Sequence, residues 1–185
     1  WMGDDWFHYG AFRQNSLDFF AGQMSVRGAG ETVRRDAYDD YEAFRRAGSL
    51  GAWAKANGLE HFPAWRKMSE HPAYDAFWQG QDLVRVMAAQ PLTVPTMWIQ
   101  GLWDQEDIYG AIAVYKAIKP KDTGNDKVFL VAGPWHHGQE IDDASTLGAL
   151  KFNSDTGLYF RQNILRPFLD QYLKDGAPKA DVPPV

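Results

Sequence analysis

The sequence predicts an α/β fold in which parallel strands alternate with helices, together with a separate all-helical segment. Two apolar runs, VPTMWIQG at 94–101 and KVFLVAG at 127–133, are too short for helices and rich in β-branched and aromatic residues, as buried strands are. A helical periodicity follows each run, and this alternation of strand and helix indicates parallel strands. With 185 residues and 45% hydrophobic composition, the chain can bury a sizeable core.

The pattern divides the chain into four parts. Residues 1–25 are aromatic and irregular, 26–90 are helical, 91–176 hold the two strands and their helices, and 177–185 form a linker. Two strands do not make a stable sheet alone, so we expect further strands upstream of Trp1 and interpret the chain as a fragment of a longer polypeptide.

Glycine and proline punctuate the predicted helices. Gly48 should end the first helix of 26–90, breaks follow at Gly58 and Pro63, and Pro72 should open one further helix that runs to residue 90. In 91–176 the periodicity predicts one helix from 108 to 118 and another from about Ser154 to Lys174 that bends at Pro167.

Composition excludes several classes of function. The net charge of −5 without a basic stripe makes nucleic acid and anionic membranes poor partners, and no apolar run approaches the length of a membrane span. Cysteine is absent, which excludes thiolate catalysis, disulfides and cysteine-bound zinc. We expect a neutral or cationic small molecule as the ligand and leave a homo-oligomer open.

Acidic and imidazole side chains follow the two predicted strands. Asp104 comes just after the first strand, and His136 and His137 come just after the second. The carboxyl ends of parallel strands meet at one edge of a sheet, so Asp104 should lie next to a histidine that it could orient and stabilise when that ring takes a proton. Successive extended residues point in opposite directions, so only one of His136 and His137 can face Asp104. The alternatives are a helix N-cap for Asp104 and packed loop histidines.

A serine nucleophile would complete this pair, but the sequence lacks a strand–turn–helix Gly-x-Ser-x-Gly motif. The nearest segment is AGSLG at 47–51, where Ala47 replaces the first glycine and the surroundings are helical. We interpret Ser49 as a helix terminus and expect the catalytic serine upstream of Trp1.

Three segments carry a resemblance to a known family. WMGDDWFHYGAFR at 1–13, VPTMWIQGLWDQEDIYGA at 94–111 and GPWHHG at 133–138 resemble the α-amino acid ester hydrolases. These belong to a larger group with cocaine esterase, glutaryl acylases and X-Pro dipeptidyl-peptidases. The resemblance implies the C-terminal part of an α/β-hydrolase fold with an inserted helical cap at 26–90, without the upstream strands and the nucleophile. It also implies that 177–185 lead toward a jelly-roll domain.

The resemblance assigns site residues. It selects His137 as the catalytic base and Asp104 as its acid, and it implies that Asp5, Glu106 and Asp107 hold the substrate's α-ammonium group. Glu106 and Asp107 could instead complement a helix dipole in a first helical turn. Aromatic residues could wall a substrate pocket, the alternative being ordinary core: Trp6, Tyr9, Trp103 and Trp135.

The implied activity is serine-dependent hydrolysis or aminolysis of esters and β-lactam amides of α-amino acids. We expect no cofactor and no metal, and the resemblance implies a periplasmic or secreted location. X-Pro dipeptidyl-peptidase, cocaine-esterase-like and glutaryl-acylase-like specificities remain alternatives, as does a non-catalytic fragment or binding module. A metal-dependent hydrolase is a further alternative, with the ligands Asp104, Glu106, Asp107, His136 and His137.

Overall fold

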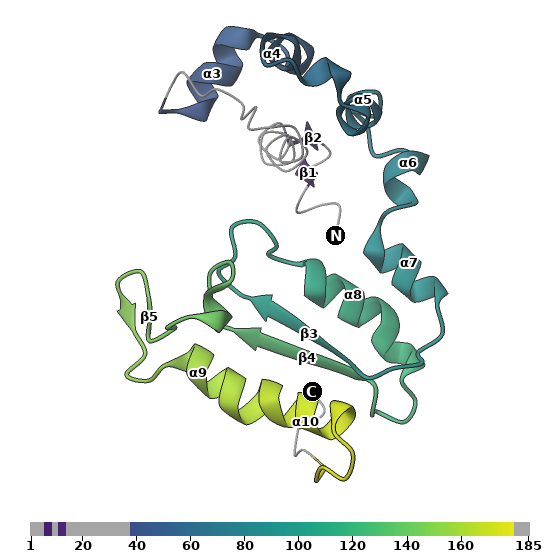
Figure 1. Cartoon of the computed structure of the whole chain (residues 1–185), viewed down its shortest axis with the longest axis vertical. Coiled ribbons are helices and arrows are strands. Elements are labelled where there is room, and N and C mark those ends of the chain that lie inside the picture. The colour runs from purple at the N-terminus through teal and green to yellow at the C-terminus, as the bar shows by residue number, and fades with distance from the viewer. Residues whose placement is uncertain (1–5, 9–10, 14–37, 180–185) are drawn as a thin grey trace. The chain divides into compact units, whose positions relative to one another are not determined.

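The computed structural model describes residues 6–8, 11–13 and 38–179 (Figure 1). The chain forms two compact units, Met2–Gly80 and Gln81–Val185, which we call the helical unit and the sheet unit. The division falls at Gly80 and not at residue 90. Helix α7 (Leu83–Ala89) packs on helix α8 (Gly110–Ile118) of the sheet unit, whereas the sequence had placed α7 in the helical part.

Short helices and one small hairpin make up the described helical unit. Its elements are β1 (Phe7–His8), β2 (Ala11–Phe12), α3 (Asp40–Ala47), α4 (Leu50–Ala56), the 3-10 turn η1 (Leu59–His61), α5 (Pro63–Ser69) and α6 (Ala76–Gln79). The hairpin pairs Phe7 with Phe12 in antiparallel register, a pairing that the irregular pattern of residues 1–25 did not predict.

The predicted breaks lie where glycine and proline stand. Gly48 and Gly58 adopt positive φ angles of 78° and 67°, which favour glycine, and Pro63 occupies the first turn of α5. The prediction for Pro72 is wrong. Asp75 and Asp82 cap two separate helices, α6 and α7, because each carboxylate accepts a backbone N–H of the turn that it begins.

An aromatic cluster forms the core of the helical unit. The ring of Trp6 lies 5.0 Å from that of Trp78, and Phe7 meets Trp78 edge-on at 5.4 Å. The first described segment is therefore part of this core, together with Trp53 and Trp65.

The sheet unit contains the two predicted strands. Its elements are α7, β3 (Thr96–Gly101), α8 (Gly110–Ile118), the 3-10 turn η2 (Lys119–Lys121), β4 (Val128–Gly133), the 3-10 turn η3 (Gln139–Ile141), β5 (Thr146–Leu147), β6 (Leu150–Lys151), α9 (Thr156–Phe160), η4 (Arg161–Leu165) and α10 (Arg166–Leu173). Strands β3 and β4 are parallel, with Thr96 opposite Val128 and Gly101 opposite Gly133. The prediction of parallel strands is confirmed, and both strands end level with each other.

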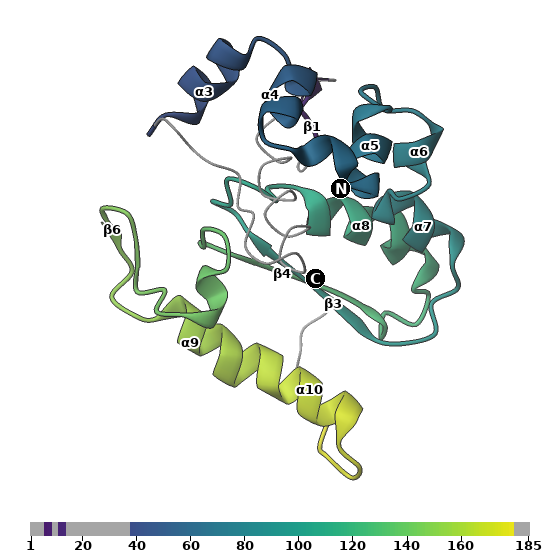
Figure 2. The same ribbon diagram turned by 45° about the horizontal axis from the view of Figure 1, so that its top comes forward.

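Helices cover both faces of this sheet. Figures 1 and 2 show α8 on one side of β3 and β4 and the helix of α9 and α10 on the other. Val128 packs with Val114 and Ile118 of α8, while Phe129, the next residue of β4, meets Phe168 of α10 edge-on at 5.5 Å. The alternation along the strand thus buries both faces, which accounts for its continuous apolar sequence.

The last helix contains an irregular turn. Residues Arg161–Leu165 form a π-helical turn between α9 and α10, and Pro167 stands in the first turn of α10. A proline within a helix lacks its N–H and crowds the preceding turn, so a wider turn just before it accommodates the ring. No helix in the described ranges is long and apolar enough to cross a membrane.

Candidate active site

The loops that follow β3 and β4 leave the sheet side by side. The Leu102 N–H donates to the Gly133 carbonyl at 2.9 Å, and the Trp103 N–H donates to the Trp135 carbonyl at 3.0 Å. Backbone pairing thus continues beyond the last residues of both strands. The loop after β3 brings Asp104, and the loop after β4 brings His137.

Two glycines permit this close approach. A Cβ on Gly101 would lie 2.7 Å from the Trp135 carbonyl oxygen, and a Cβ on Gly133 would lie 2.5 Å from carbons of the Trp135 ring. Both distances are far below van der Waals contact, so a side chain on Gly101 would push the two loops apart and one on Gly133 would displace the Trp135 ring of its own loop. The glycine that ends each strand is therefore required by packing.

Asp104 and His137 are in direct contact. Nδ1 of His137 lies 2.9 Å from Oδ2 of Asp104, whose side chain is 8% exposed, while that of His137 is 47% exposed. The other carboxylate oxygen, Oδ1, accepts the backbone N–H groups of Glu106 at 2.7 Å and Asp107 at 2.9 Å. One oxygen of Asp104 thus fixes its own loop and the other faces the imidazole. The contact predicted from the sequence is present.

These contacts shift the pKa of both groups in opposite directions. Burial by itself would raise the pKa of Asp104, but the hydrogen bonds from the Asp107 and Glu106 backbone and from His137 outweigh it and lower that pKa. The hydrogen bond to Asp104 raises the pKa of His137, against its partial burial and with help from the charges of Glu106 and Asp107. The ionised carboxylate therefore stabilises the imidazolium.

Two further carboxylates surround the imidazole. Oε2 of Glu106 lies 3.8 Å from Nε2 of His137, and Oδ2 of Asp107 lies 3.8 Å from Nδ1. We call Glu106 and Asp107 the acidic pair. Helix α8 begins at Gly110 with no acidic residue in its first turn, so the interpretation of this pair as first-turn helix residues is wrong. Ile108, predicted as helical, also precedes α8.

The same groups could be considered as cation ligands. Asp104, Asp107 and His137 each offer one ligand atom, and these atoms lie within 4.8 Å of one another. Two ligands about 2.0–2.1 Å from one tetrahedral ion are separated by about 3.3 Å. The 2.9 Å between His137 Nδ1 and Asp104 Oδ2 is shorter, and it is the distance of a direct hydrogen bond. The arrangement fits a histidine–carboxylate pair better than a metal centre.

Two buried glutamines, which the sequence reasoning missed, hold the site loops. Gln100, the last residue but one of β3, is 3% exposed and bonds to the loop after its own strand. Gln139 follows His137; its Oε1 accepts the His136 N–H at 3.2 Å and its Nε2 donates to the Thr146 carbonyl at 2.7 Å. For Gln100 the available signal was an amide side chain inside an apolar strand, next to the glycine that ends it.

The remaining predicted residues take other positions. His136 is exposed, and its Nδ1 lies 3.1 Å from the His137 carbonyl oxygen, not against Asp104. Trp103 is 70% exposed, beside Asp104 in the chain. Trp135 is 2% exposed and donates its Nε1–H to Thr156 Oγ1, and Trp6 is buried in the helical unit. Both are buried among core side chains, and their role as pocket walls stays a prediction.

Other predictions concern Ser49 and the first residues of the chain. Asp5 and Tyr9 lie outside the described residues. Ser49 caps helix α4, where its hydroxyl accepts the Ala52 N–H at 3.1 Å, as expected of a helix terminus.

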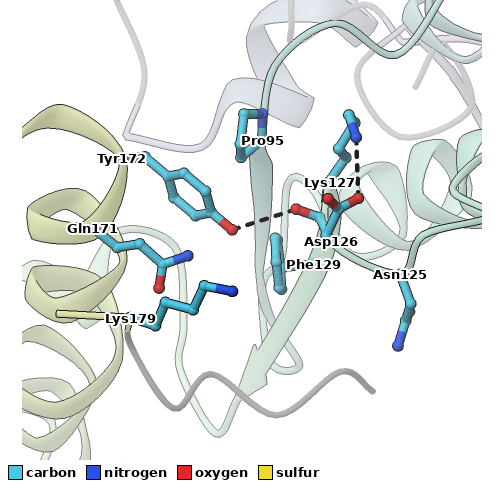
Figure 3. A pocket seen from close by; sticks show the side chains of 8 residues that line it. All are labelled: Pro95, Asn125, Asp126, Lys127, Phe129, Gln171, Tyr172 and Lys179. Atoms are coloured by element: carbon cyan, nitrogen blue, oxygen red, sulfur yellow. Dashed lines mark hydrogen bonds and ion pairs between the residues drawn. The ribbon is translucent and has the colours of Figure 1, made fainter.

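A hollow of about 380 Å³ lies at the other end of the sheet (Figure 3). Residues that precede the two strands line it, among them Pro95, Asp126 and Lys127, and the Tyr172 hydroxyl spans it to the Asp126 carbonyl at 3.3 Å. The candidate active site follows the carboxyl ends of the same strands. The hollow is therefore separate from the histidine–carboxylate pair.

The fold and the site together define the class of protein. Parallel strands carry helices on both faces, an acid follows one strand, and a histidine follows the next. This is the carboxy-terminal part of an α/β-hydrolase fold, in which acid and histidine come in that chain order.

Comparisons with known proteins give the family. Residues 1–139 match the X-Pro dipeptidyl-peptidase (S15) family, and the chain belongs to this hydrolase family. A solved α-amino acid ester hydrolase is 60% identical with a TM-score of 0.91, and an aminopeptidase from the marine sediment archaeon Thaumarchaeota archaeon is 49% identical with a TM-score of 0.92. The whole chain aligns with each of them but spans only 30% of their length. No curated protein sequence matches the chain.

Proposed function

We propose that this chain supplies the catalytic base and its orienting acid for serine-dependent acyl transfer from α-amino acid esters and amides. The observation that carries the proposal is the 2.9 Å contact between His137 Nδ1 and Asp104 Oδ2 at the carboxyl ends of two parallel strands. The names of the two solved relatives support it, because one is an α-amino acid ester hydrolase and the other an aminopeptidase.

The hydrogen bond determines what each imidazole nitrogen can do. With Asp104 ionised, Nδ1 carries a proton and donates it to Oδ2, which leaves Nε2 unprotonated and able to accept a proton. A serine hydroxyl would attack the acyl carbon and pass its proton to Nε2. His137 would then give that proton to the leaving alcohol or amine, and water would release the acyl group by the reverse sequence.

The serine would come from outside this chain. The chain spans 30% of its solved relatives, and we expect the nucleophile on an upstream segment of the same polypeptide. In α/β-hydrolases the serine precedes the acid and the histidine in the chain. The order Asp104 before His137 agrees with that arrangement.

The acidic pair would select an α-ammonium group. Glu106 and Asp107 each have a carboxylate oxygen 3.8 Å from an imidazole nitrogen of His137. In an α-amino acyl substrate the ammonium nitrogen is only two bonds from the carbonyl carbon, so a carboxylate close to the base is well placed to bind it. Such a cation would also relieve the mutual repulsion of Asp104, Glu106 and Asp107. Asp5, outside the described residues, would be the third member of this group.

The chemical mechanism is tested in the polypeptide that carries the nucleophile. We expect covalent labelling by a serine-directed fluorophosphonate, strong loss of labelling in His137→Gln, and full activity in the presence of a chelator. Activity that disappears with the chelator and returns with a divalent ion would contradict the proposal and favour the ligand set of Asp104, Asp107 and His137.

The specificity is tested with a pair of esters that differ only in the α-amino group. Glu106→Gln and Asp107→Asn should lower kcat/KM for the α-amino ester by about tenfold or more, since each removes a charged partner of the ammonium. The ester without the amino group should be nearly unaffected. Asp142→Asn, which removes one exposed charge from the same loop region as His137, is the matched control. Equal losses on both esters would remove the specificity proposal.

The acyl group that is transferred distinguishes this function from a second candidate. The family description favours a peptidase that releases X-Pro dipeptides as a second candidate. A panel of an α-amino ester, an α-amino β-lactam amide and an X-Pro anilide separates the two, because the acidic pair would serve an α-ammonium group next to the scissile bond. Turnover confined to the X-Pro substrate would favour the second candidate.

A further inference from the structure

Gln100 holds the backbone of the loop that carries the acidic pair, through bonds to Gly101, Asp107 and Ala111. Its Nε2 donates to the Asp107 carbonyl and to the Gly101 carbonyl, the latter at 3.0 Å. Its Oε1 accepts the Ala111 N–H, in the first turn of α8, at 3.2 Å. A buried amide leaves its polar atoms unpaired only at considerable cost, so a side chain with three partners is strongly held in one position.

Together with a bond from Asp104, these bonds hold the backbone of one loop residue, Asp107. We call this arrangement of Asp104, Asp107 and Gln100 the clamp. The N–H of Asp107 donates to Asp104 Oδ1 at 2.9 Å, while its C=O accepts from Gln100. Asp104 and Gln100 therefore hold the two backbone polar groups of Asp107. Since Asp104 also contacts His137, this clamp relates the position of the acidic pair to that of the base.

Gln139 performs a separate task on the other loop. It accepts the His136 N–H and donates to the Thr146 carbonyl, so it shapes the loop that carries His137. Among the described residues, Gln139 makes no hydrogen bond to the loop that carries Glu106 and Asp107. The two buried amides thus hold two different parts of the same site.

We propose that Gln100 is a positioning residue for substrate selection, because it holds the backbone of Asp107, whose carboxylate would bind the substrate's ammonium group, while other contacts hold the His137–Asp104 pair. This inference rests on the proposed function and adds the residue that sets its specificity. When Gln100 is removed, Asp104 should keep its backbone bond to Glu106 and its contact with His137. The base should thus survive a change that displaces Asp107.

The variants follow from the hydrogen bonds. Gln100→Met has a similar length and no amide, so it removes all three bonds. Gln100→Glu keeps an acceptor for the Ala111 N–H but places a carboxylate oxygen against two carbonyls. Gln139→Met is the matched control for loss of a buried amide in the other loop. The polypeptide that carries the nucleophile is used throughout, with circular dichroism and melting temperature to identify folded variants.

The first measurement compares the α-amino ester with the ester that lacks the amino group. For Gln100→Met and Gln100→Glu we expect the ratio of their kcat/KM values to fall about tenfold, mainly through KM of the α-amino ester. For Gln139→Met we expect similar losses on both esters and an unchanged ratio. An unchanged ratio in folded Gln100 variants would overturn the inference.

The second measurement needs no activity. Amide hydrogen exchange should be accelerated over residues 104–111 in Gln100→Met, with a smaller change at Ala111 in Gln100→Glu, whereas Gln139→Met should leave this segment protected. Unchanged exchange in both Gln100 variants would overturn the clamp. A parent protein that hydrolyses neither ester would overturn the proposed function instead, and the exchange result would still decide the clamp. If Gln100→Met fails to fold, Gln100→Glu carries both measurements.

Discussion

The charge of Asp104 is the strongest test of the proposed chemistry. Asp104→Asn keeps the shape of the side chain but replaces one oxygen with an NH2 group. In the parent chain, Oδ1 of Asp104 accepts two backbone N–H groups. An NH2 group turned toward these donors in the variant would find no acceptor there. The amide oxygen should therefore keep that place, which leaves Nδ2 facing His137 Nδ1 where Oδ2 stood, 2.9 Å away.

That substitution should reverse the imidazole tautomer. Nδ1 must become the acceptor for the amide, so the single proton of the neutral ring moves to Nε2, which can then no longer take a proton from serine. The same replacement in a known serine triad lowers kcat about 10,000-fold, equivalent to about 5.5 kcal/mol. We expect a loss of this order here with little change in KM.

The assay is steady-state kinetics on an α-amino ester at neutral pH, with a thermal melt to verify folding. Since the amide oxygen still holds the loop, the melting temperature should change by only a few degrees. A folded Asp104→Asn variant with kcat within tenfold of the parent would refute the role of Asp104 as the orienting acid. Asp142→Asn again controls for the loss of one charge.

Further predictions follow from the same contacts. The pKa of His137 is raised and the base acts when neutral, so kcat/KM should fall as pH drops through a value above 6.5. This acidic limb of the pH profile should move to lower pH in Glu106→Gln, because one of the charges that raise the pKa of His137 is then absent. An acidic limb at or below pH 6.5 in the parent would contradict this. Gly133→Ala should lower both the melting temperature and the activity, because its Cβ would overlap the Trp135 ring, whereas Gly51→Ala, with open space around it, should do neither. Asp122→Asn should lower the free energy of unfolding by about 2 kcal/mol near pH 7, measured by urea unfolding. Despite burial, hydrogen bonds from the backbone and from Lys119 lower the pKa of Asp122 from 3.8 to about 2. The stabilisation by its carboxylate is therefore present above pH 4 and is lost as pH falls through about 2. A constant difference between pH 7 and pH 2 would contradict this account.

Local patterns predicted the elements of the sheet unit closely. The apolar runs at 94–101 and 127–133 contain β3 and β4, and their alternation with helices predicted the parallel pairing. The approach of Asp104 to His137 followed from that topology alone, since both residues come directly after strands that end at one edge. These predictions succeeded because a strand that is buried on both faces has a continuous apolar sequence, which is easily recognised.

Other features depended on contacts that periodicity does not encode. Helical spacing extended α8 back to Ile108, but the side chain of Asp104 bonds to the backbone of Glu106 and Asp107 and holds them in a loop before Gly110. Trp135 lies beside the site in the sequence, yet it is buried and donates to Thr156 from a distant part of the chain. Neither result follows from helical periodicity: the bonds of Asp104 compete locally with the helix, and the partner of Trp135 lies 21 residues away and is met only after folding.

The sequence by itself determined the order of strands and helices, the glycines where the strands end, and the side chains available for chemistry at the sheet edge. The tertiary structure decided how the amides of Gln100 and Gln139 hold the two loops, and it placed His137 against Asp104 as the family resemblance had implied. The physical reason is the distance along the chain over which each interaction acts. Strand burial and glycine turns act over a few neighbouring residues, whereas a buried hydrogen bond requires a partner that only the folded chain brings within about 3 Å.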